Sequence, residues 1–283
     1  MNGTKTFLTG LLGEGIAASR SPEIHQSEAK ALGITLIYRT IDFKEHQWSV
    51  TDLPDVLTAA ENFGFNGLNI THPYKQAVLP LLNELSEEAS AIGSVNTVVF
   101  SSGRRIGYNT DWYGFTESFK IGLADVPIQN VVLIGAGGAG VAVGYALLRL
   151  GIQDLFIVDI NNYKAEDLAL RLLSNFTGCR TTAVADAGNI ITQADGIVQT
   201  TPVGMSSYPG MPFDADLLGS HQWLAEIIYF PIETEILKYA RSISCKTISG
   251  GGMAVHQAAK AFELFTGVKP DVERMVIEFA KGG

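Results

Sequence analysis

Cysteine, positive charge and long hydrophobic runs are all scarce in this 283-residue chain, and each shortage excludes a class of protein. The two cysteines, Cys179 and Cys245, lie far apart and form no CxxC pair. They predict neither a disulfide scaffold nor a thiolate metal site, and they fit a reducing compartment. The five histidines show no HxxxH or carboxylate-flanked spacing, so we expect no bound metal.

Membrane and nucleic acid are also disfavoured as partners. No apolar run approaches the roughly 20 residues of a membrane span, and the first residues lack the apolar segment of a signal peptide. The formal net charge is −9 and Lys and Arg are nowhere clustered, whereas binding to phosphates needs a basic face. We expect a cytoplasmic protein, a monomer or a homodimer, that binds a small molecule.

What the chain does contain is a regular alternation of strand-like and helix-like segments. In the first part they are predicted as strands over 5–13 and 34–43 and helices over 21–33, 52–63 and about 75–85. Ser21 is the expected N-cap of the first helix, with Pro22 at the first helical position. Residues 97–110 are typical of a hairpin with SSGR as its turn.

From about residue 130, buried strands alternate with helices of a length that implies βαβ units and a doubly wound parallel sheet. We therefore predict a two-domain α/β fold. Its parts are an N-terminal α/β substrate domain (1–112), a Rossmann-type dinucleotide domain (113–252) and C-terminal helices that return to the first domain (253–283). The cleft between the domains is the expected ligand site.

The segment VVLIGAGGAG, residues 131–140, carries a G-x-G-x-x-G fingerprint between an apolar strand and a helical pattern. The first glycine permits a tight turn, the second lets the backbone approach a pyrophosphate, and the third allows close helix–sheet packing. The helix N-terminus favours the anion. The alternative is a glycine-rich turn that binds nothing. The predicted cofactor contacts are Gly135, Ala136, Gly137, Gly138 and Ala139.

Asp159 ends the next predicted strand, where a carboxylate accepts hydrogen bonds from ribose hydroxyls and repels a 2′-phosphate. The residues that follow place no arginine where a 2′-phosphate clamp is expected, and Lys164 is the nearest cation. We interpret the site as one for NAD, with NADP disfavoured. The alternative role for Asp159 is to cap a helix or a loop.

Four clusters of the first domain, SRSPEIH, NITHPYK, GSVNT and GYNTD, are too polar for a core. Their hydroxyls, amides, ammonium and carboxylate suit a small polyhydroxylated ligand. With TTPVGM, YFPIETEIL and GGMAVHQAAKAFELFTG they follow the order found in the shikimate dehydrogenase family. The chain resembles that family nearly end to end, and within it the NAD-dependent quinate/shikimate branch.

The resemblance implies an alcohol dehydrogenase that interconverts shikimate and 3-dehydroshikimate, with quinate as a weaker substrate. Lys75 matches the family's catalytic lysine and Asp111 its carboxylate partner. The pair suits the reaction because the hydroxyl proton needs an acceptor as hydride leaves the carbinol carbon. How the two groups divide the proton transfer stays open.

The resemblance also implies ligand contacts. Ser19 and Ser21 match the pair that holds the substrate carboxylate. The positions that match contacts to the ring hydroxyls are Asn69, Thr71, Asn96, Tyr229 and Gln257. The positions on the nicotinamide side are Thr200, Met205 and Gly252. Structural roles remain as alternatives, in a turn for Asn69, in a buried strand for Tyr229 and in the core for Met205.

The sequence departs from the family pattern in places. Gln26 follows His25, where many shikimate dehydrogenases have asparagine, and Asp159-Ile160-Asn161 replaces the Asn-Arg-Thr of NADP-dependent members. In the quinate/shikimate branch a threonine can stand at the position of Ser21. The preference among shikimate, quinate and an aminoshikimate therefore stays open.

Two other hypotheses belong to different functional classes. A non-catalytic dinucleotide-binding regulator on the same fold is disfavoured, because Lys75 and Asp111 are both present. A two-domain dehydrogenase for a folate or an amino acid is disfavoured by the paired serines and by NITHPYK.

Overall fold

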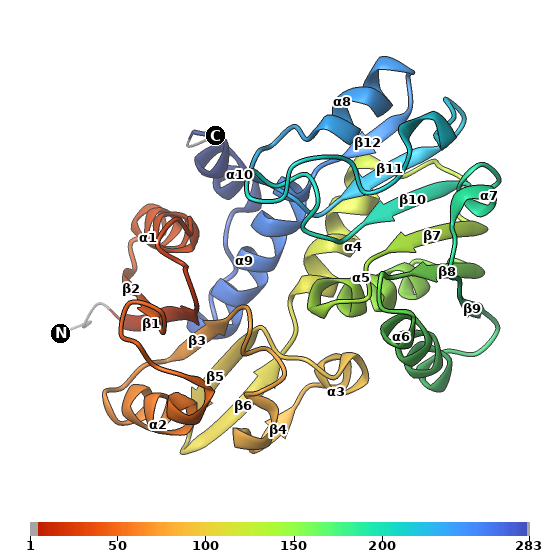
Figure 1. Cartoon of the computed structure of the whole chain (residues 1–283). Coiled ribbons are helices and arrows are strands. Elements are labelled where there is room, and N and C mark those ends of the chain that lie inside the picture. Colours follow the sequence, from red (N-terminus) through yellow and green to blue (C-terminus); the bar gives the residue numbers. More distant parts are fainter. Residues whose placement is uncertain (1–4, 282–283) are drawn as a thin grey trace. The chain divides into compact units, whose positions relative to one another are not determined.

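The computed structural model describes residues 5–281. The chain folds into two compact units (Figure 1). Of the described residues, the first unit contains 5–110 and 257–281, and the second contains Asp111–His256. Helix α9 (Gly250–Thr266) contributes residues to both. Asp111, which the prediction placed in the substrate domain, is the first residue of α4 (Asp111–Gly122) in the second unit.

The first unit is built on a mixed sheet, drawn in red to yellow in Figure 1. Its strands, in spatial order, are β2 (Thr35–Asp42), β1 (Thr6–Gly13), β3 (Gly67–Ile70), β5 (Thr97–Ser101), β6 (Arg104–Tyr108) and β4 (Glu84–Leu85). β2, β1 and β3 are parallel, whereas β5 is antiparallel to β3 and β6. The carboxyl ends of β1, β3 and β6 therefore meet the start of β5 at one edge of the sheet.

Helices cover both faces of this sheet. They are α1 (Ser21–Ala31), α2 (Leu53–Asn62), α3 (Glu87–Ile92), the second half of α9, α10 (Val272–Ala280) and the 3-10 turns Val50–Asp52 and Leu79–Leu81. Successive strand side chains point to opposite faces. Tyr38 of β2 thus belongs to a core with Phe262 of α9, whereas Leu68 of β3 belongs to another with Leu57 of α2.

The helix predicted over 75–85 is wrong. The chain forms turns there, then the 3-10 turn Leu79–Leu81 and strand β4, because Pro80 has no N–H to donate to a continuing helix. Helix α3 begins after Ser86, whose hydroxyl oxygen accepts a hydrogen bond from the N–H of Ala89 at 3.1 Å.

The expected N-cap of α1 is also wrong, whereas the predicted hairpin is confirmed. Arg20 is the N-cap, and Ser21 is already the first helical residue. Proline is tolerated directly after it, because the first N–H groups of a helix have no partner within the helix. In the hairpin turn, Ser102 and Gly103 have φ angles of 53° and 72°. Two successive positive φ values match the twist of the flanking strands.

The second unit is built on a sheet in which every strand pairing is parallel. Its spatial order is β12 (Lys246–Ile248), β11 (Trp223–Glu226), β10 (Gly196–Gln199), β7 (Asn130–Ile134), β8 (Asp154–Val158) and β9 (Arg180–Ala183). The order reverses between β7 and β10, the place where doubly wound sheets bind dinucleotides. The predicted fold class is confirmed.

The helices of the second unit follow the strands in alternation. They are α4, α5 (Gly138–Arg149), α6 (Asn162–Asn175), α7 (Gly188–Ile191), α8 (Glu235–Ser242), the first half of α9 and the 3-10 turn Ala215–Leu217. Within the part of the chain that the structure describes, no helix has the length and apolar character needed to span a bilayer.

Candidate active site

A continuous hydrogen-bonded chain of polar side chains lies at the carboxyl edge of the first sheet. The Tyr38 hydroxyl donates to Oδ1 of Asn69 at 2.7 Å, and Nδ2 of Asn69 donates to Oγ1 of Thr97 at 3.0 Å. The Thr97 hydroxyl donates to Oδ1 of Asn96 at 3.1 Å. Nδ2 of Asn96 then donates to Oγ1 of Thr110 at 2.9 Å. These bonds hold the Asn69 and Asn96 amides in fixed orientations. Any further hydrogen bond that these amides make to a ligand therefore has a fixed direction.

The two serines of the first polar cluster are bonded to each other. The Ser19 hydroxyl donates to Oγ of Ser21 at 3.2 Å, and the N–H of Ser21 donates to Oγ of Ser19 at 3.3 Å. Both serines stand at the N-terminus of α1, where backbone N–H groups and the helix dipole favour an anion. This arrangement suits a carboxylate.

Tyr38 begins the chain by its bond to Asn69, and the sequence reasoning missed it. Burial raises the pKa of Tyr38, so its hydroxyl stays protonated and able to donate at physiological pH. The His25 ring packs on the Tyr38 ring with centroids 4.8 Å apart. The backbone N–H of Tyr38 donates a hydrogen bond to Oε1 of Gln26 at 3.2 Å. A tyrosine within the strand predicted over 34–43 was the signal available in the sequence.

Replacing Tyr38 by phenylalanine is expected to leave Oδ1 of Asn69 without the phenolic donor. The loss of this hydrogen bond in a buried setting should lower the free energy of unfolding by about 1–3 kcal/mol. Chemical denaturation of both proteins measures this. Tyr239→Phe is the matched control, because its hydroxyl contacts Asp216 at 3.3 Å on the exposed surface. Equal effects of the two variants would contradict the role given to Tyr38.

Lys75 and Asp111 are both tied to this chain through their neighbours. The carbonyl of half-buried Lys75 accepts a hydrogen bond from the N–H of Val95 at 2.9 Å, and Asn96 follows Val95. Oδ1 of Asn96 accepts from the N–H of Thr110 at 2.7 Å, and Asp111 follows Thr110. Asp111 itself is 2% exposed.

On its other side, Asp111 is followed by Trp112, which anchors the start of α4 to α5. The Trp112 ring packs edge-on against Tyr145 with centroids 5.7 Å apart, and the Arg149 guanidinium lies 5.9 Å from the Trp112 ring centre. The residues that flank Asp111 are therefore both held in place.

Thr71 and Gln257 lie on the first unit. Thr71 follows β3, and its methyl group occupies the space at Gly13, where a Cβ would come within 2.3 Å of it. Gly13 is therefore a glycine because Thr71 packs closely against the end of β1. Gln257 is half-buried in the middle of α9.

The glycine fingerprint has the geometry that a pyrophosphate requires. Gly135 has a φ of 101°, a conformation open to glycine. A Cβ at Gly140 would lie 2.0 Å from the carbonyl oxygen of Gly135, so the helix can approach the strand only without a side chain there. Cβ atoms at Gly137 or Gly138 would meet open space. The loop therefore leaves room for an anion at the N-terminus of α5, and these residues fit a dinucleotide.

Thr200 supports this loop from the neighbouring strand. Its hydroxyl lies within hydrogen-bond distance of the carbonyl oxygens of Ile134 and Gly135, at 2.9 and 2.8 Å. The residue before it, Gln199, accepts from the N–H of Thr201 at 2.6 Å and donates to the carbonyl of Val203 at 2.7 Å. Gln199 therefore shapes the TTPVGM loop, a role that sequence reasoning missed.

Asp159 is half-buried at the end of β8 and touches the fingerprint directly. Its Oδ2 accepts a hydrogen bond from the N–H of Ala136 at 2.7 Å, and its Oδ1 accepts from the N–H of Asn161 at 2.8 Å. The carboxylate thus joins the glycine loop to the start of α6, beside the switch point of the sheet.

Met205, Tyr229 and Gly252 lie on loops and a helix of the second unit. Met205 is 37% exposed and Tyr229 is 44% exposed, so neither is a core residue. Desolvation of the hydroxyl, and then the charge of Asp111, raise the pKa of Tyr229. A Cβ at Gly252 would lie 2.3 Å from Oγ of Ser118, so this glycine allows α9 to pack against α4.

Comparison with known proteins identifies the family to which the chain belongs. A model of the shikimate dehydrogenase substrate binding domain matches residues 11–98, and one of the shikimate 5′-dehydrogenase C-terminal domain matches residues 250–276. The quinate/shikimate dehydrogenase (NAD(+)) of Corynebacterium glutamicum is 47% identical over 274 residues, which cover 95% of this chain and 96% of that protein. The chain belongs to the shikimate dehydrogenase family.

Other members of the shikimate dehydrogenase family are about equally similar. The shikimate dehydrogenase (NADP(+)) of Streptomyces avermitilis is 46% identical over 278 residues, 98% of this chain and 96% of that protein. The solved structure of quinate dehydrogenase from Corynebacterium glutamicum in complex with NAD matches with a TM-score of 0.92 at 46% identity, covering 98% of this chain and 99% of that one. The names of these relatives differ in both substrate and dinucleotide.

Glu226, at the end of β11, is a buried titratable group of this family member that sequence reasoning missed. It is 1% exposed, and its Oε2 accepts a hydrogen bond from the hydroxyl of Thr234 at 2.6 Å. Thr234 is the N-cap of α8. Burial raises the pKa of Glu226 to about 7, although the hydrogen bond from Thr234 opposes the shift.

This raised pKa predicts a pH dependence of stability. The pKa is higher in the folded chain than in the unfolded one, so the stabilisation is fully present below the unfolded value of 4.5 and is lost as pH rises through about 7. The loss is on the order of 3 kcal/mol in the free energy of unfolding. Urea unfolding of wild type and Glu226→Gln between pH 4.5 and 8 measures it. Parallel pH profiles for the two proteins would contradict the assignment.

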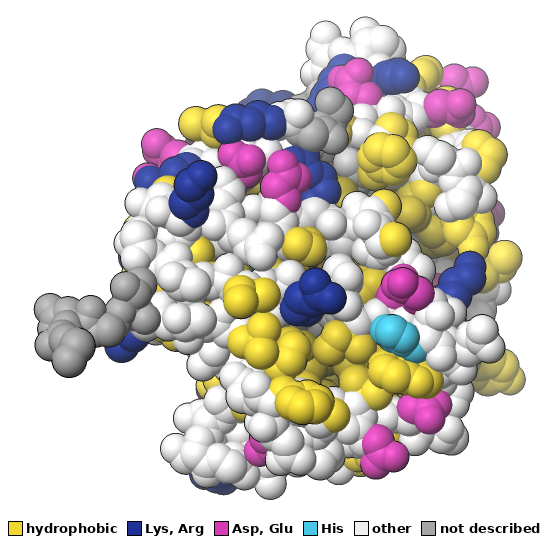
Figure 2. Space-filling view, turned by 90° about the vertical axis from the view of Figure 1, so that its left-hand side faces the viewer, with side chains coloured by type: hydrophobic (Ala, Val, Ile, Leu, Met, Phe, Trp, Pro, Cys, Tyr) yellow, Lys and Arg dark blue, Asp and Glu magenta, His cyan; other side chains and the backbone are white. Residues whose placement is uncertain are grey.

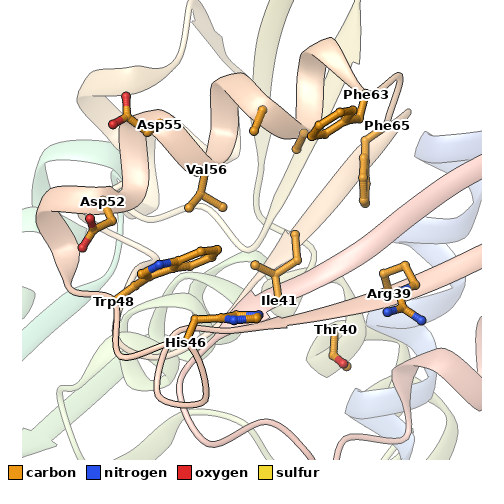
Figure 3. Close-up of a pocket in the computed structure, with 12 residues that line it drawn as sticks. Arg39, Thr40, Ile41, His46, Trp48, Asp52, Asp55, Val56, Phe63 and Phe65 are labelled. Atoms are coloured by element: carbon orange, nitrogen blue, oxygen red, sulfur yellow. The ribbon is translucent and has the colours of Figure 1, made fainter.

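A hydrophobic hollow of about 500 Å³ lies apart from these residues, between β2 and α2 (Figure 3). His46 stacks on Trp48 with centroids 4.4 Å apart, and Arg39 lines the hollow from β2. Hydrophobic side chains also gather beside a histidine on the face shown in Figure 2. Arg39 follows Tyr38 in the strand, so the hollow is on the opposite face of the sheet from the polar chain.

No metal centre appears in residues 5–281, where no three His, Cys, Asp or Glu side chains come together in a way that could hold an ion.

Proposed function

We propose that the protein is an NAD-dependent dehydrogenase that interconverts shikimate and 3-dehydroshikimate, with quinate as a weaker substrate. The observation that carries the proposal is the hydrogen-bonded chain from Tyr38 to Thr110. It presents fixed hydroxyl and amide groups, it ends one residue before Asp111, and Lys75 is bonded to the residue next to Asn96. Family membership and the fingerprint loop of the second unit support the same reaction class.

In this proposal the ligand contacts follow the polar chain. Ser19 and Ser21, at the N-terminus of α1, hold the substrate carboxylate. The groups proposed to bind the ring hydroxyls are Asn69, Thr71, Asn96, Tyr229 and Gln257. A site that hydrogen-bonds each hydroxyl rejects analogues that lack one, because its own polar groups are then left unpaired.

Lys75 and Asp111 carry the acid–base chemistry in this proposal. Bound NAD supplies the hydride acceptor. Nζ of Lys75 accepts the proton of the substrate hydroxyl during oxidation and returns it during reduction, and the carboxylate of Asp111 orients the ammonium and balances its charge.

The preference for NAD is proposed from Asp159. Its carboxylate stands at the end of β8, where the adenine ribose binds in doubly wound sheets. It would accept hydrogen bonds from both ribose hydroxyls and repel the 2′-phosphate of NADP. Residues 135–139 would hold the pyrophosphate, with Thr200 keeping their loop in place, and Met205 and Gly252 would lie on the nicotinamide side. A cytoplasmic location and a monomeric or dimeric state stay predictions.

An initial-rate grid tests the function. Shikimate, quinate and aminoshikimate are each assayed with NAD and with NADP, following the reduced nicotinamide by absorbance. We expect the highest kcat/KM for shikimate with NAD. Preference for aminoshikimate would change the substrate, preference for NADP would overturn the role of Asp159, and no reduction with any pair would overturn the dehydrogenase.

A further inference from the structure

Arg20 stands between the two serines, yet its side chain turns to the C-terminal helix. Its Nη2 donates to the carbonyl of Glu278 at 3.2 Å, and its Nη1 donates to the carbonyl of Phe279. The guanidinium also lies 5.5 Å from the centre of the Phe279 ring. Both carbonyls belong to the last turn of α10.

These contacts supply hydrogen-bond donors to carbonyl groups at the C-terminal end of α10. The last carbonyl groups of a helix have no partner within the helix, and a cation near them complements the helix dipole. The backbone of Arg20 meanwhile serves α1. It is the N-cap of that helix, and its carbonyl accepts a hydrogen bond from the N–H of Ile24 at 3.1 Å. The side chain of Arg20 therefore caps the C-terminal end of α10, and its backbone is the N-cap of α1.

The guanidinium also makes an ion pair in this position. Its Nε and Nη2 also donate to Oε2 of Glu23, at 3.1 and 2.7 Å. The Arg20 side chain is only 18% exposed, and its charge is balanced by Glu23. Arg20 is thus bound to two other elements, while its neighbours Ser19 and Ser21 bond to each other.

We infer that Arg20 is a positioning residue, which fixes the carboxylate-binding serines by anchoring their turn to the last turn of α10. The inference rests on the proposed function, in which Ser19 and Ser21 hold the substrate carboxylate. As N-cap, Arg20 makes no side-chain capping bond to α1, and the local bond from the N–H of Ser21 to Oγ of Ser19 is long at 3.3 Å, so the Arg20 anchor is what ties this turn to another element. The C-terminal helix thereby contributes to substrate affinity without touching substrate.

A second ion pair between the same two helices is the matched control. Arg274 of α10 donates to both carboxylate oxygens of Glu28 in α1, at 2.7 and 2.8 Å, and Glu28 is 1% exposed. This pair also holds α10 on α1, but it lies seven or more residues from the serines. Loss of either arginine should lower stability, whereas only loss of Arg20 should change substrate binding.

The experiment compares wild type with Arg20→Met, Arg20→Lys and Arg274→Met, using shikimate and saturating NAD. Arg20→Met should raise KM for shikimate about tenfold, which corresponds to no more than the loss of one hydrogen bond to a charged group. It should change kcat by less than about threefold. Arg20→Lys keeps the charge but not the planar fork, so KM should remain well above that of wild type. Arg274→Met should lower the melting temperature and leave KM unchanged.

In the comparison of the variants, three outcomes would overturn the inference. They are an unchanged KM in Arg20→Met, the same rise of KM in Arg274→Met, and full rescue by Arg20→Lys. Assays at about 0.05 and 0.5 M NaCl separate positioning from charge attraction, because salt screens the latter. A KM difference that disappears at high salt would also overturn it. An inactive wild type would instead refute the proposed function, since the inference concerns only differences between active proteins.

Discussion

Lys75→Ala is expected to lower kcat for shikimate oxidation by about 10²–10⁴-fold, the range in which removal of a general acid–base falls. Substrate affinity should change much less, because the serines and amides of the polar chain remain. The hydrogen bonds that join Tyr38, Asn69, Thr97, Asn96 and Thr110 are made between other side chains, so the truncation should leave them in place.

The measurement is the steady-state rate as a function of substrate concentration, for oxidation and for reduction, in wild type and in Lys75→Ala. It gives KM and kcat separately. Lys120→Ala is the control, because that side chain is 59% exposed and pairs with Glu117 on the surface of α4. Turnover within twofold of wild type in Lys75→Ala would remove Lys75 from the mechanism. A rise of KM with unchanged kcat would make it a binding residue only.

Asp159→Ala has the second largest expected effect, on the choice of cofactor. Loss of hydrogen bonds between the carboxylate and the ribose hydroxyls should raise KM for NAD about 10–100-fold. Repulsion of the 2′-phosphate disappears at the same time, so the ratio of kcat/KM for NAD to that for NADP should fall. The N–H of buried Ala136 loses its partner as well, and a lower melting temperature should accompany the kinetic change.

A neighbouring aspartate provides the control for this variant. Asp154 lies at the other end of β8 and pairs with Arg180 across to β9. Asp154→Ala removes a carboxylate from the same strand without touching the glycine loop. An NAD/NADP ratio that is the same in wild type, Asp154→Ala and Asp159→Ala would refute the role proposed for Asp159.

Local rules were enough to predict the parts of the fold that depend on local geometry. The fingerprint loop follows from the steric need for glycine at Gly135 and Gly140, and the hairpin turn follows from positive φ at Ser102 and Gly103. The failures were local too. Pro80 stops the helix expected over 75–85, and Pro22 made Ser21 look like an N-cap when the cap is one residue earlier.

The sequence by itself determined the doubly wound sheet, the glycine loop with Asp159 and the family, because these depend on periodicity, steric limits and order along the chain. Only the tertiary structure decided that Tyr38 is bonded to Asn69, that Glu226 is buried, and that Arg20 caps a helix 259 residues away. Such contacts join segments far apart in the chain. Their partners follow from how helices and strands pack, which no short window of sequence contains.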